Sequence, residues 1–202
     1  MADVRLIAGT DEAGRGPLAG AVFAGAVLLD PERPIEGLND SKKLTAKRRD
    51  SLFAQIRQRS ICWTVSAATV QEIDALNILH ASMLAMKRAV SALRPTPDFV
   101  YVDGNRVPDW SFESEALVGG DGRVAAVSAA SIVAKVCRDR YMNRMAQAFP
   151  GYGFERHAGY PTAFHLQALR ERGPCAIHRK SYAPVKQADL FAQAAQSTAT
   201  QE

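Results

Sequence analysis

Apolar residues follow two different spacings along the chain, and these spacings predict strands first and then helices alternating with strands. Short apolar runs that stop at glycine, proline or aspartate are typical of buried strands. Such runs predict strands at Val4–Thr10, Gly20–Leu29, Ser60–Ala68 and Asp98–Val102. A glycine- and proline-containing turn separates the first two, which favours a hairpin.

Apolar residues spaced three or four positions apart predict helices further along the chain. The predicted helices are Asn77–Leu93, Val124–Phe149 and Pro161–Arg172. Asp40–Gln58 predicts a loop that opens with an Asp-Ser cap and runs into a basic helix. The chain after Arg172 is predicted to be irregular. This order of elements favours an α/β fold in which helices flank a mixed sheet.

The composition fits a single globular domain. Of the 202 residues, 47% are hydrophobic and 23% are charged, which argues against disorder as the main state. Residues 1–185 are expected to form the domain, and the polar residues 186–202 a flexible tail. Three cysteines without a C-x-x-C spacing argue against a disulfide framework or a structural zinc site. With no signal peptide and no apolar stretch of about 20 residues, a cytoplasmic protein outside the membrane is expected.

Acidic residues stand where the predicted strands end and where the long helix begins. Asp11 and Glu12 follow the first strand, Asp103 follows the Asp98–Val102 strand, and Asp121 precedes the long helix. A carboxylate at the carboxyl end of a central strand faces the crevice where α/β sheets usually bind ligands. The sequence therefore predicts that the sheet brings these four carboxylates together.

Each of these positions also has a plainer interpretation. Adjacent acidic pairs and Asp-Gly sequences are common in turns. The glycines of the first motif suggest a dinucleotide-binding loop, but their spacing is one residue too long, and Pro17 and a strand-like run replace the required helix. Asp139 lies four residues after Lys135 on the long helix, which favours a solvated ion pair outside the site.

A cluster of four carboxylates is unfavourable by itself, because like charges disfavour ionisation of one another. Two Mg²⁺ or Mn²⁺ ions would neutralise it, and oxygen-only ligands select these hard metals over zinc. The formal net charge of +4 makes the surroundings of such an acidic centre basic, which suits a polyanion. These features favour a metal-dependent, phosphodiester-cleaving nuclease.

Six motifs, in order from about Arg5 to Val185, resemble the ribonuclease HII family. They are DEAGRG, DSKKL at Asp40–Leu44, YVDG at Tyr101–Gly104, AASIVAKVCRDR at Ala129–Arg140, HAGYPT at His157–Thr162 and IHRKSY at Ile177–Tyr182. The resemblance implies a ribonuclease H-like fold with a five-stranded mixed sheet and a helical C-terminal part. It also implies cleavage of the RNA strand in RNA–DNA hybrids. Incision 5′ to single ribonucleotides in duplex DNA, with 3′-hydroxyl and 5′-phosphate ends, is implied as well.

The resemblance assigns roles residue by residue. The family's four active-site carboxylates, which hold Mn²⁺ or Mg²⁺ in a two-metal mechanism, match Asp11, Glu12, Asp103 and Asp121. Gly14-Arg15-Gly16 matches the loop whose backbone contacts the ribose 2′-hydroxyl, and Tyr160 matches the tyrosine that stacks on the following sugar. Candidate phosphate contacts are Lys42, Lys43, Lys135, His178 and Arg179. The alternatives are a core tyrosine and solvated surface charges.

Two rival functions stay open at this point. Another nuclease of the same fold, such as a junction-resolving enzyme, would share the carboxylates without needing the GRG loop or Tyr160. A non-catalytic module that binds hybrids would have no reason to keep four carboxylates facing a polyanion. The chain is expected to act as a monomer.

The sequence Gln187-Ala188-Asp189-Leu190-Phe191 resembles the Q-x-x-L-F peptide by which bacterial replication and repair proteins bind the sliding clamp. Such a peptide offers a groove one glutamine amide and two adjacent apolar side chains. Clamp binding would raise the local concentration of a repair enzyme at new DNA. The alternative is that Leu190 and Phe191 cover the protein's own core.

Overall fold

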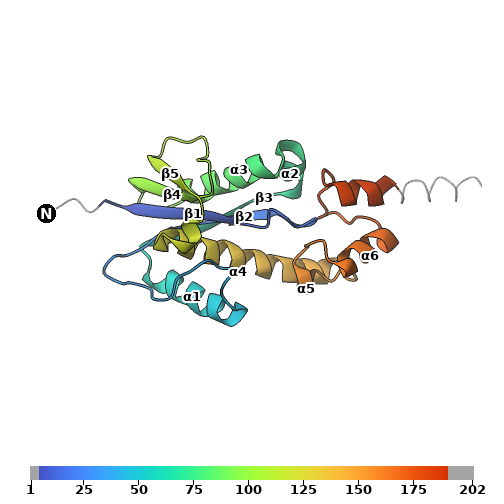
Figure 1. The fold of residues 1–202 in the computed structure, drawn as a ribbon, viewed down its shortest axis with the longest axis horizontal. Helices are drawn as coiled ribbons and strands as arrows, with labels where there is room; N and C mark the ends of the chain where they lie inside the picture. Colours follow the sequence, from blue (N-terminus) through green and yellow to red (C-terminus); the bar gives the residue numbers. More distant parts are fainter. Residues whose placement is uncertain (1–4, 191–202) are drawn as a thin grey trace, which may run out of the picture.

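A five-stranded sheet lies at the centre of the computed structural model, which describes residues 5–190 (Figure 1). The strand order is β3-β2-β1-β4-β5. The strands are β1 (Ile7–Ala13), β2 (Val22–Leu28), β3 (Cys62–Ala68), β4 (Phe99–Asp103) and β5 (Ser114–Leu117). β2 is antiparallel to both β1 and β3, whereas β4 is parallel to both β1 and β5. The predicted mixed sheet and the hairpin of the first two strands are confirmed.

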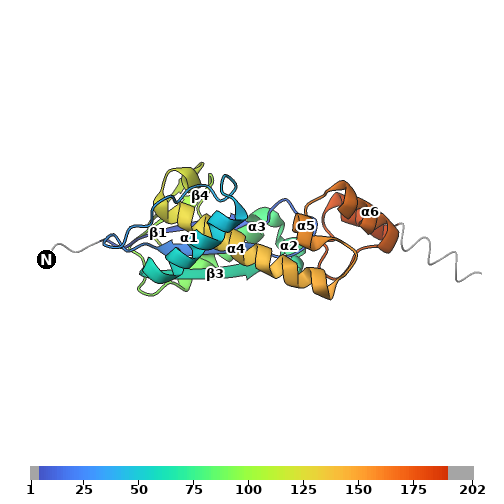
Figure 2. The ribbon, with the colours of Figure 1, turned by 90° about the horizontal axis from the view of Figure 1, so that it is seen from below.

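Helices cover both faces of this sheet (Figures 1 and 2). α2 (Val70–Leu76) and α3 (Ile78–Ser91) lie on one face, and α1 (Ala46–Arg59) and α4 (Ala125–Ala148) lie on the other. Alternate residues of β2 pack against small buried residues of α3, while Val27 packs with α1 and α4. Because strand side chains alternate between faces, β2 contributes to both cores. None of the helices in residues 5–190 combines the length and apolar character that crossing a membrane requires.

The close packing of α4 on β1 depends on Gly9. A β-carbon at this position would lie 2.3 Å from the backbone of Ala126 and Val127, so no other residue fits without moving the helix. The first turn of α4 therefore lies directly on the central strand, two residues before Asp11.

Three short helices form the C-terminal part, at the far end of the sheet from the start of β1 (Figure 2). They are α5 (Phe154–His157), α6 (Ala163–Arg172) and a helix at 183–190. One small core joins Ala19 to Met142 of α4 and to Phe154, and another joins Leu18 to α6 and to the last helix. The C-terminal part thus packs against the segment that immediately follows the Gly14-Arg15-Gly16 loop.

The first strand begins and ends later in the chain than the predicted Val4–Thr10. β1 starts at Ile7 and continues to Ala13, because pairing with β2 extends through Asp11 and Glu12. The two acidic residues therefore lie within the strand and not in the turn after it. The predicted strands at 20–29, 60–68 and 98–102 and the helices at 77–93, 124–149 and 161–172 are confirmed with small shifts of their ends.

Other boundaries were wrong for local reasons. α1 begins at Ala46 with the Thr45 hydroxyl as its N-cap, whereas Asp40 accepts a hydrogen bond from the backbone N–H of Lys42 in a separate turn. The stretch after Arg172 is not wholly irregular, since residues 183–190 are helical. The predicted tail boundary at residue 185 therefore falls inside a helix. Residues 191–202, including Phe191, lie outside the described chain.

Candidate active site

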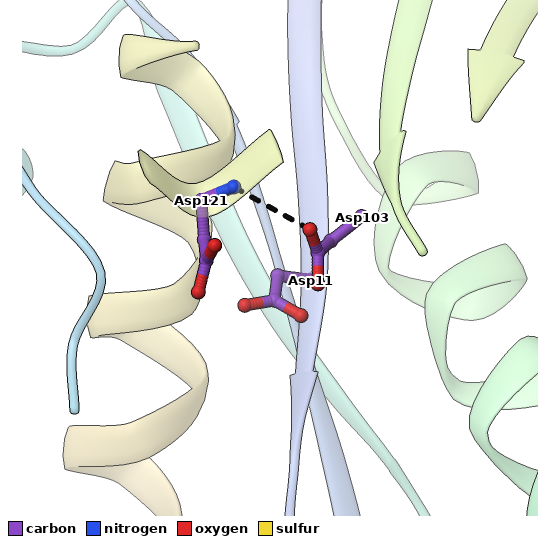
Figure 3. A group of neighbouring side chains, drawn as sticks. All are labelled: Asp11, Asp103 and Asp121. Atoms are coloured by element: carbon purple, nitrogen blue, oxygen red, sulfur yellow. Dashed lines mark hydrogen bonds between the residues drawn. The ribbon is translucent and has the colours of Figure 1, made fainter. Parts of the chain in front are cut away.

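Three aspartates from three different elements meet at one point (Figure 3). Asp11 lies in β1, Asp103 is the last residue of β4, and Asp121 lies in the 3-10 helix η1 (Gly120–Gly122). One carboxylate oxygen from each lies within 4.8 Å of the others. The meeting point is therefore a compact group of oxygen ligands.

The strand register explains why Asp11 and Asp103 face each other. Gly9 pairs with Tyr101 across the parallel strands β1 and β4, and the two aspartates lie two residues further along each strand. Side chains two residues apart share a face, so both aspartates lie on the face that carries α4. Asp121 reaches the same face because η1 immediately precedes α4. The prediction that the fold would bring these three residues together is confirmed in their positions.

The backbone supports this arrangement. The Asp121 N–H donates a hydrogen bond to Oδ1 of Asp103 at 3.4 Å, and the Glu12 N–H donates to Oδ1 of Asp11 at 2.6 Å. The Ser128 hydroxyl, one turn into α4, donates to the Asp121 carbonyl. Main-chain and hydroxyl donors thus hold carboxylates that would otherwise repel one another.

The electrostatics of the group are unfavourable without a counterion. Burial raises the pKa of Asp11 well above its usual value, and the charges of Glu12 and Asp103 raise it further. Burial and the charge of Asp103 likewise raise the pKa of Asp121. A group of buried carboxylates with raised pKa values is typical of a functional site.

Glu12 stands slightly apart from the three aspartates. It is not one of the three residues whose oxygens converge, and its Oε1 lies 3.3 Å from Nη1 of Arg15. Burial raises the pKa of Glu12, and the nearby guanidinium of Arg15 partly offsets this. Glu12 nevertheless lies close enough to Asp103 for the charge of that residue to raise its pKa as well.

The donor set fits a hard divalent cation. All ligands in the group are carboxylate oxygens, which Mg²⁺ and Mn²⁺ prefer, and zinc sites use mainly histidine and cysteine. A cation would also remove the repulsion that raises the pKa of Asp11. Asp11, Asp103 and Asp121 are therefore the residues that could hold a metal ion, with Glu12 beside them.

The Gly14-Arg15-Gly16 loop directly follows β1, which carries Asp11 and Glu12, and Tyr160 lies beside the last glycine of the loop. Gly14 has a φ of +102°, and a β-carbon there would lie 2.0 Å from Nε of Arg138, so the position requires glycine. A β-carbon at Gly16 would lie 3.4 Å from the Tyr160 ring. Tyr160 is 44% exposed, so the alternative of a core tyrosine is wrong.

Two of the predicted phosphate contacts are wrong. His178 is 1% exposed and Arg179 is fully buried, so neither side chain can reach a phosphate at the surface. The ring of His178 bonds to His165 and Cys175, and Arg179 bonds to backbone carbonyls beneath the loop that follows β1. The sequence gives no local sign of this burial.

Comparisons with known proteins agree with the geometry. The ribonuclease HII family model matches residues 8–185. The chain belongs to the ribonuclease HII family. A ribonuclease HII from Marinomonas sp. (strain MWYL1) is 59% identical over 182 residues, covering 90% of this chain and 92% of that protein. The family cleaves the RNA of RNA–DNA hybrids and depends on a metal ion, so this chain is a hybrid-cleaving endonuclease.

Solved structures share the whole architecture. The ribonuclease H2 from Pyrococcus horikoshii OT3 has a TM-score of 0.76 and 28% identity, covering 93% of this chain and 98% of that chain. Ribonuclease HII in the PCNA:RNase HII complex from Archaeoglobus fulgidus has a TM-score of 0.71 and 27% identity, covering 87% and 93%. The sheet, its flanking helices and the helical C-terminal part are therefore those of this ribonuclease H-like fold.

The DSKKL loop brings two more charges to the carboxylates. Burial, the charge of Asp103 and then the charge of Asp40 raise the pKa of Asp121, and sequence reasoning missed this influence of Asp40. Burial would lower the pKa of Lys42, but the charges of Asp11 and Asp40, among others, raise it overall. Lys42 and Lys43 are both exposed, so the structure leaves them available to a ligand. The DSKKL motif was the sequence signal that could have placed Asp40 near the carboxylates.

A groove of about 920 Å³, lined by both basic and acidic residues, runs between α1, α4 and the segment that carries Tyr160. Its lining includes Arg49, Lys135, Arg140 and Tyr160. Nζ of Lys135 lies 2.7 Å from Oδ1 of Asp139, which confirms the predicted ion pair. Lys135 thus lies in the groove but already has a carboxylate partner. Sequence reasoning missed Arg49 and Arg140, which also have carboxylate partners, Asp139 at 4.0 Å and Asp50 at 3.0 Å.

Proposed function

We propose that this enzyme also incises duplex DNA on the 5′ side of a single embedded ribonucleotide, leaving 3′-hydroxyl and 5′-phosphate ends. The observation that carries the proposal is the position of the exposed Tyr160 ring beside Gly16, in the loop that follows the strand of Asp11 and Glu12. A glycine backbone approaches a sugar closely, and the 2′-hydroxyl is the group that distinguishes RNA from DNA. One loop and one ring are enough to recognise one sugar, so neighbouring ribonucleotides are not required.

Asp11, Asp103 and Asp121 would hold Mg²⁺ or Mn²⁺, with Glu12 as a fourth carboxylate next to them. When bound, two such ions activate water and stabilise the leaving oxygen of a phosphodiester. The carboxylates make the metal side of the site acidic, and Lys42 is close enough to feel the charges of Asp11 and Asp121. The backbone of Asp121 is held by its N–H bond to Asp103 and by the Ser128 hydroxyl, which donates to its carbonyl.

Basic residues would hold the nucleic-acid backbone on either side of the cut. Lys42 and Lys43 are exposed beside the carboxylates, and Lys135, Arg49 and Arg140 line the groove. Lysine and arginine contacts to phosphates supply affinity without reading sequence. This arrangement suits an enzyme whose substrates share a sugar and not a base sequence.

The proposed setting is ribonucleotide removal from DNA by a monomer in the cytoplasm, with docking on a sliding clamp. The A. fulgidus ribonuclease HII was solved in a complex with PCNA. In the present chain Gln187 to Leu190 end the last described helix, and Leu190 is 67% exposed. An exposed leucine next to a glutamine one turn away suits a clamp-binding peptide better than a core contact.

The decisive experiment maps the cut in a duplex with one ribonucleotide. The expected result with Mg²⁺ or Mn²⁺ is a single incision 5′ to the ribonucleotide, and an all-DNA duplex of the same sequence should stay intact. A long hybrid is the positive control, and Asp103→Asn is the negative control. Cleavage of the hybrid alone would contradict the proposal and leave the family activity unaffected.

A further inference from the structure

Two arginines are buried without a carboxylate partner. Arg138 is 1% exposed and Arg179 is fully buried, and within residues 5–190 neither forms an ion pair with aspartate or glutamate. Burying a charge is costly unless hydrogen bonds compensate for its lost hydration. Burying two adjacent cations therefore lowers the stability of the fold unless other interactions compensate.

Backbone carbonyls supply the compensation. Arg179 donates to the carbonyls of Gly14, Arg15 and Gly20. Arg138 donates to the carbonyls of Ala19, Ala21 and Ala158. The two guanidiniums therefore link three segments by hydrogen bonds. These are the GRG loop, residues 19–21 after it, and Ala158 in the segment that leads to Tyr160.

A tyrosine completes this arrangement. The Tyr182 hydroxyl accepts a hydrogen bond from Nη1 of Arg179 at 3.0 Å and donates to the Arg15 carbonyl at 2.8 Å. The Arg15 carbonyl also accepts directly from Arg179 at 2.8 Å. The carbonyls of Gly14 and Arg15 therefore both accept hydrogen bonds from buried side chains on the inner side of the loop.

These bonds determine which way the loop amides point. In a planar trans peptide the C=O of one residue and the N–H of the next point in opposite directions. The only cis bond in residues 5–190 is Arg94–Pro95, so the loop peptides are trans. Because the carbonyls of Gly14 and Arg15 point inward to Arg179, the N–H groups of Arg15 and Gly16 point outward. Both residues are exposed, and Gly16 lies beside the Tyr160 ring.

We propose that Arg179, assisted by Arg138 and Tyr182, is the positioning residue that presents the two outward amides of the GRG loop to a sugar oxygen of the substrate. The inference rests on the proposed function and deepens it, because it assigns ribose selectivity to a residue that never touches the ribose. Two buried cations behind the loop also favour an electron-rich oxygen in front of it, as fixed charges act strongly where water is excluded. The ligand chemistry is a hydroxyl oxygen that accepts from two N–H groups.

The test measures selectivity of binding and not catalysis. Fluorescence anisotropy with Ca²⁺ in place of the catalytic metal gives the Kd for a duplex with one ribonucleotide and for the all-DNA duplex of the same sequence. Their ratio is the readout. Tyr182→Phe removes one hydroxyl from the arrangement, and Arg179→Lys keeps the charge but loses the forked donors. Tyr152→Phe is the matched control, since its hydroxyl donates to the Gly173 carbonyl at 2.7 Å, away from the loop.

The expected ratio falls about three- to tenfold in Tyr182→Phe and further in Arg179→Lys, with little change in affinity for all-DNA duplex. The ratio in Tyr152→Phe should equal that of the wild type. If Arg179→Lys fails to fold, Tyr182→Phe still decides, because an unchanged ratio overturns the inference. If the folded variants keep the wild-type ratio of the two Kd values, the inference is overturned but the proposed function is not. A wild type with no preference overturns the proposed function, and the inference with it.

Discussion

The backbone N–H of Asp121 donates to the Asp103 carboxylate and so joins the start of α4 to the end of β4. The bond is 3.4 Å long and lies between two elements that are otherwise separated by a loop and by β5. The carboxylates of the site repel one another, whereas the Asp121 N–H attracts the Asp103 carboxylate. Replacing a carboxylate by an amide should therefore remove repulsion and keep the geometry, because the asparagine oxygen still accepts.

Asp11→Asn and Asp103→Asn should each abolish cleavage and raise the Tm of the metal-free protein. The pKa of Asp11 is raised by burial and by neighbouring charges, so its ionised form costs stability at pH values above that raised pKa. The expected rise in Tm is about 2–4 °C for each kcal/mol of relieved repulsion. Thermal unfolding with EDTA, followed by the same scan with Mn²⁺, measures both effects.

In that experiment the wild type should gain Tm when Mn²⁺ is added, because binding to the folded state stabilises it. Each variant should gain less, since it has lost a ligand. An Asp103→Asn variant that cuts hybrids at the wild-type rate would remove Asp103 from the site. Equal Mn²⁺ shifts in all three proteins would place the metal elsewhere.

Asp121→Asn and Asp139→Asn make the same chemical change, one inside the aspartate group and one outside it. Asp121 lies in the aspartate group, whereas Asp139 lies in an ion pair with Lys135 that is only partly buried. Partly exposed ion pairs contribute about 1 kcal/mol or less, so Asp139→Asn should change cleavage by less than about tenfold. Asp121→Asn should lose cleavage almost entirely. An active Asp121→Asn together with an inactive Asp139→Asn would mean that Asp139, and not Asp121, belongs to the active site.

Tyr160→Ala should impair incision at a single ribonucleotide more than cleavage of a long hybrid. In the long hybrid many positions offer a ribose, whereas in the duplex one stacking contact selects one sugar. Stacking on an aromatic ring contributes about 1–3 kcal/mol, so a loss of about ten- to a hundredfold is expected. Steady-state kcat/KM on the two substrates gives the comparison. Equal losses on both would show that the ring does not select the sugar.

The sequence allowed the sheet and the carboxylates to be predicted because their signals are local. Apolar runs mark the long strands, and Asp11, Asp103 and Asp121 stand at the ends of elements in the sequence itself. β5 has four residues and none of them is buried, so it has no apolar run to reveal it. Burial of charge is not local either. Arg179 looks like a surface cation in IHRKSY, and only the packing of the C-terminal part against residues 14–20 encloses it.

Histidines behind Tyr160 make stability depend on pH. The Tyr160 carbonyl can only accept, so Nδ1 of His165 donates to it at 2.9 Å. Nδ1 of His178 accepts from the Cys175 N–H, so its Nε2 carries the proton and donates to Nε2 of His165 at 3.1 Å. Both rings are therefore neutral. Burial, and then the neighbouring His165, lowers the pKa of His178 to about 4. Since an unfolded histidine has a pKa near 6.5, the unfolded chain binds the proton more readily.

Stability from the neutral His178 should be complete above about pH 6.5 and should be lost as the pH falls to about 4. The amount is about 3 kcal/mol. Urea unfolding of the wild type and of His178→Gln at a series of pH values measures it as the difference between the two curves. That difference should shrink as the pH falls. His80→Gln, at an exposed histidine, is the control and should run parallel to the wild type. A parallel His178→Gln curve would contradict the prediction.

Leu190→Ala/Phe191→Ala should abolish binding to the purified clamp without lowering stability. Leu190 is 67% exposed, whereas Ala188, two residues earlier, is buried against Leu18 and Leu169. The helix therefore uses one side for the protein's own core and presents Leu190 on another. Calorimetric titration with the clamp measures binding, and Leu76→Ala, at a leucine 42% exposed on α2, is the matched control. Unchanged binding in the double variant, or none in the wild type, would contradict clamp docking. A lower Tm with no effect on binding would instead assign the pair to the core, because an exposed leucine contributes little to the free energy of unfolding.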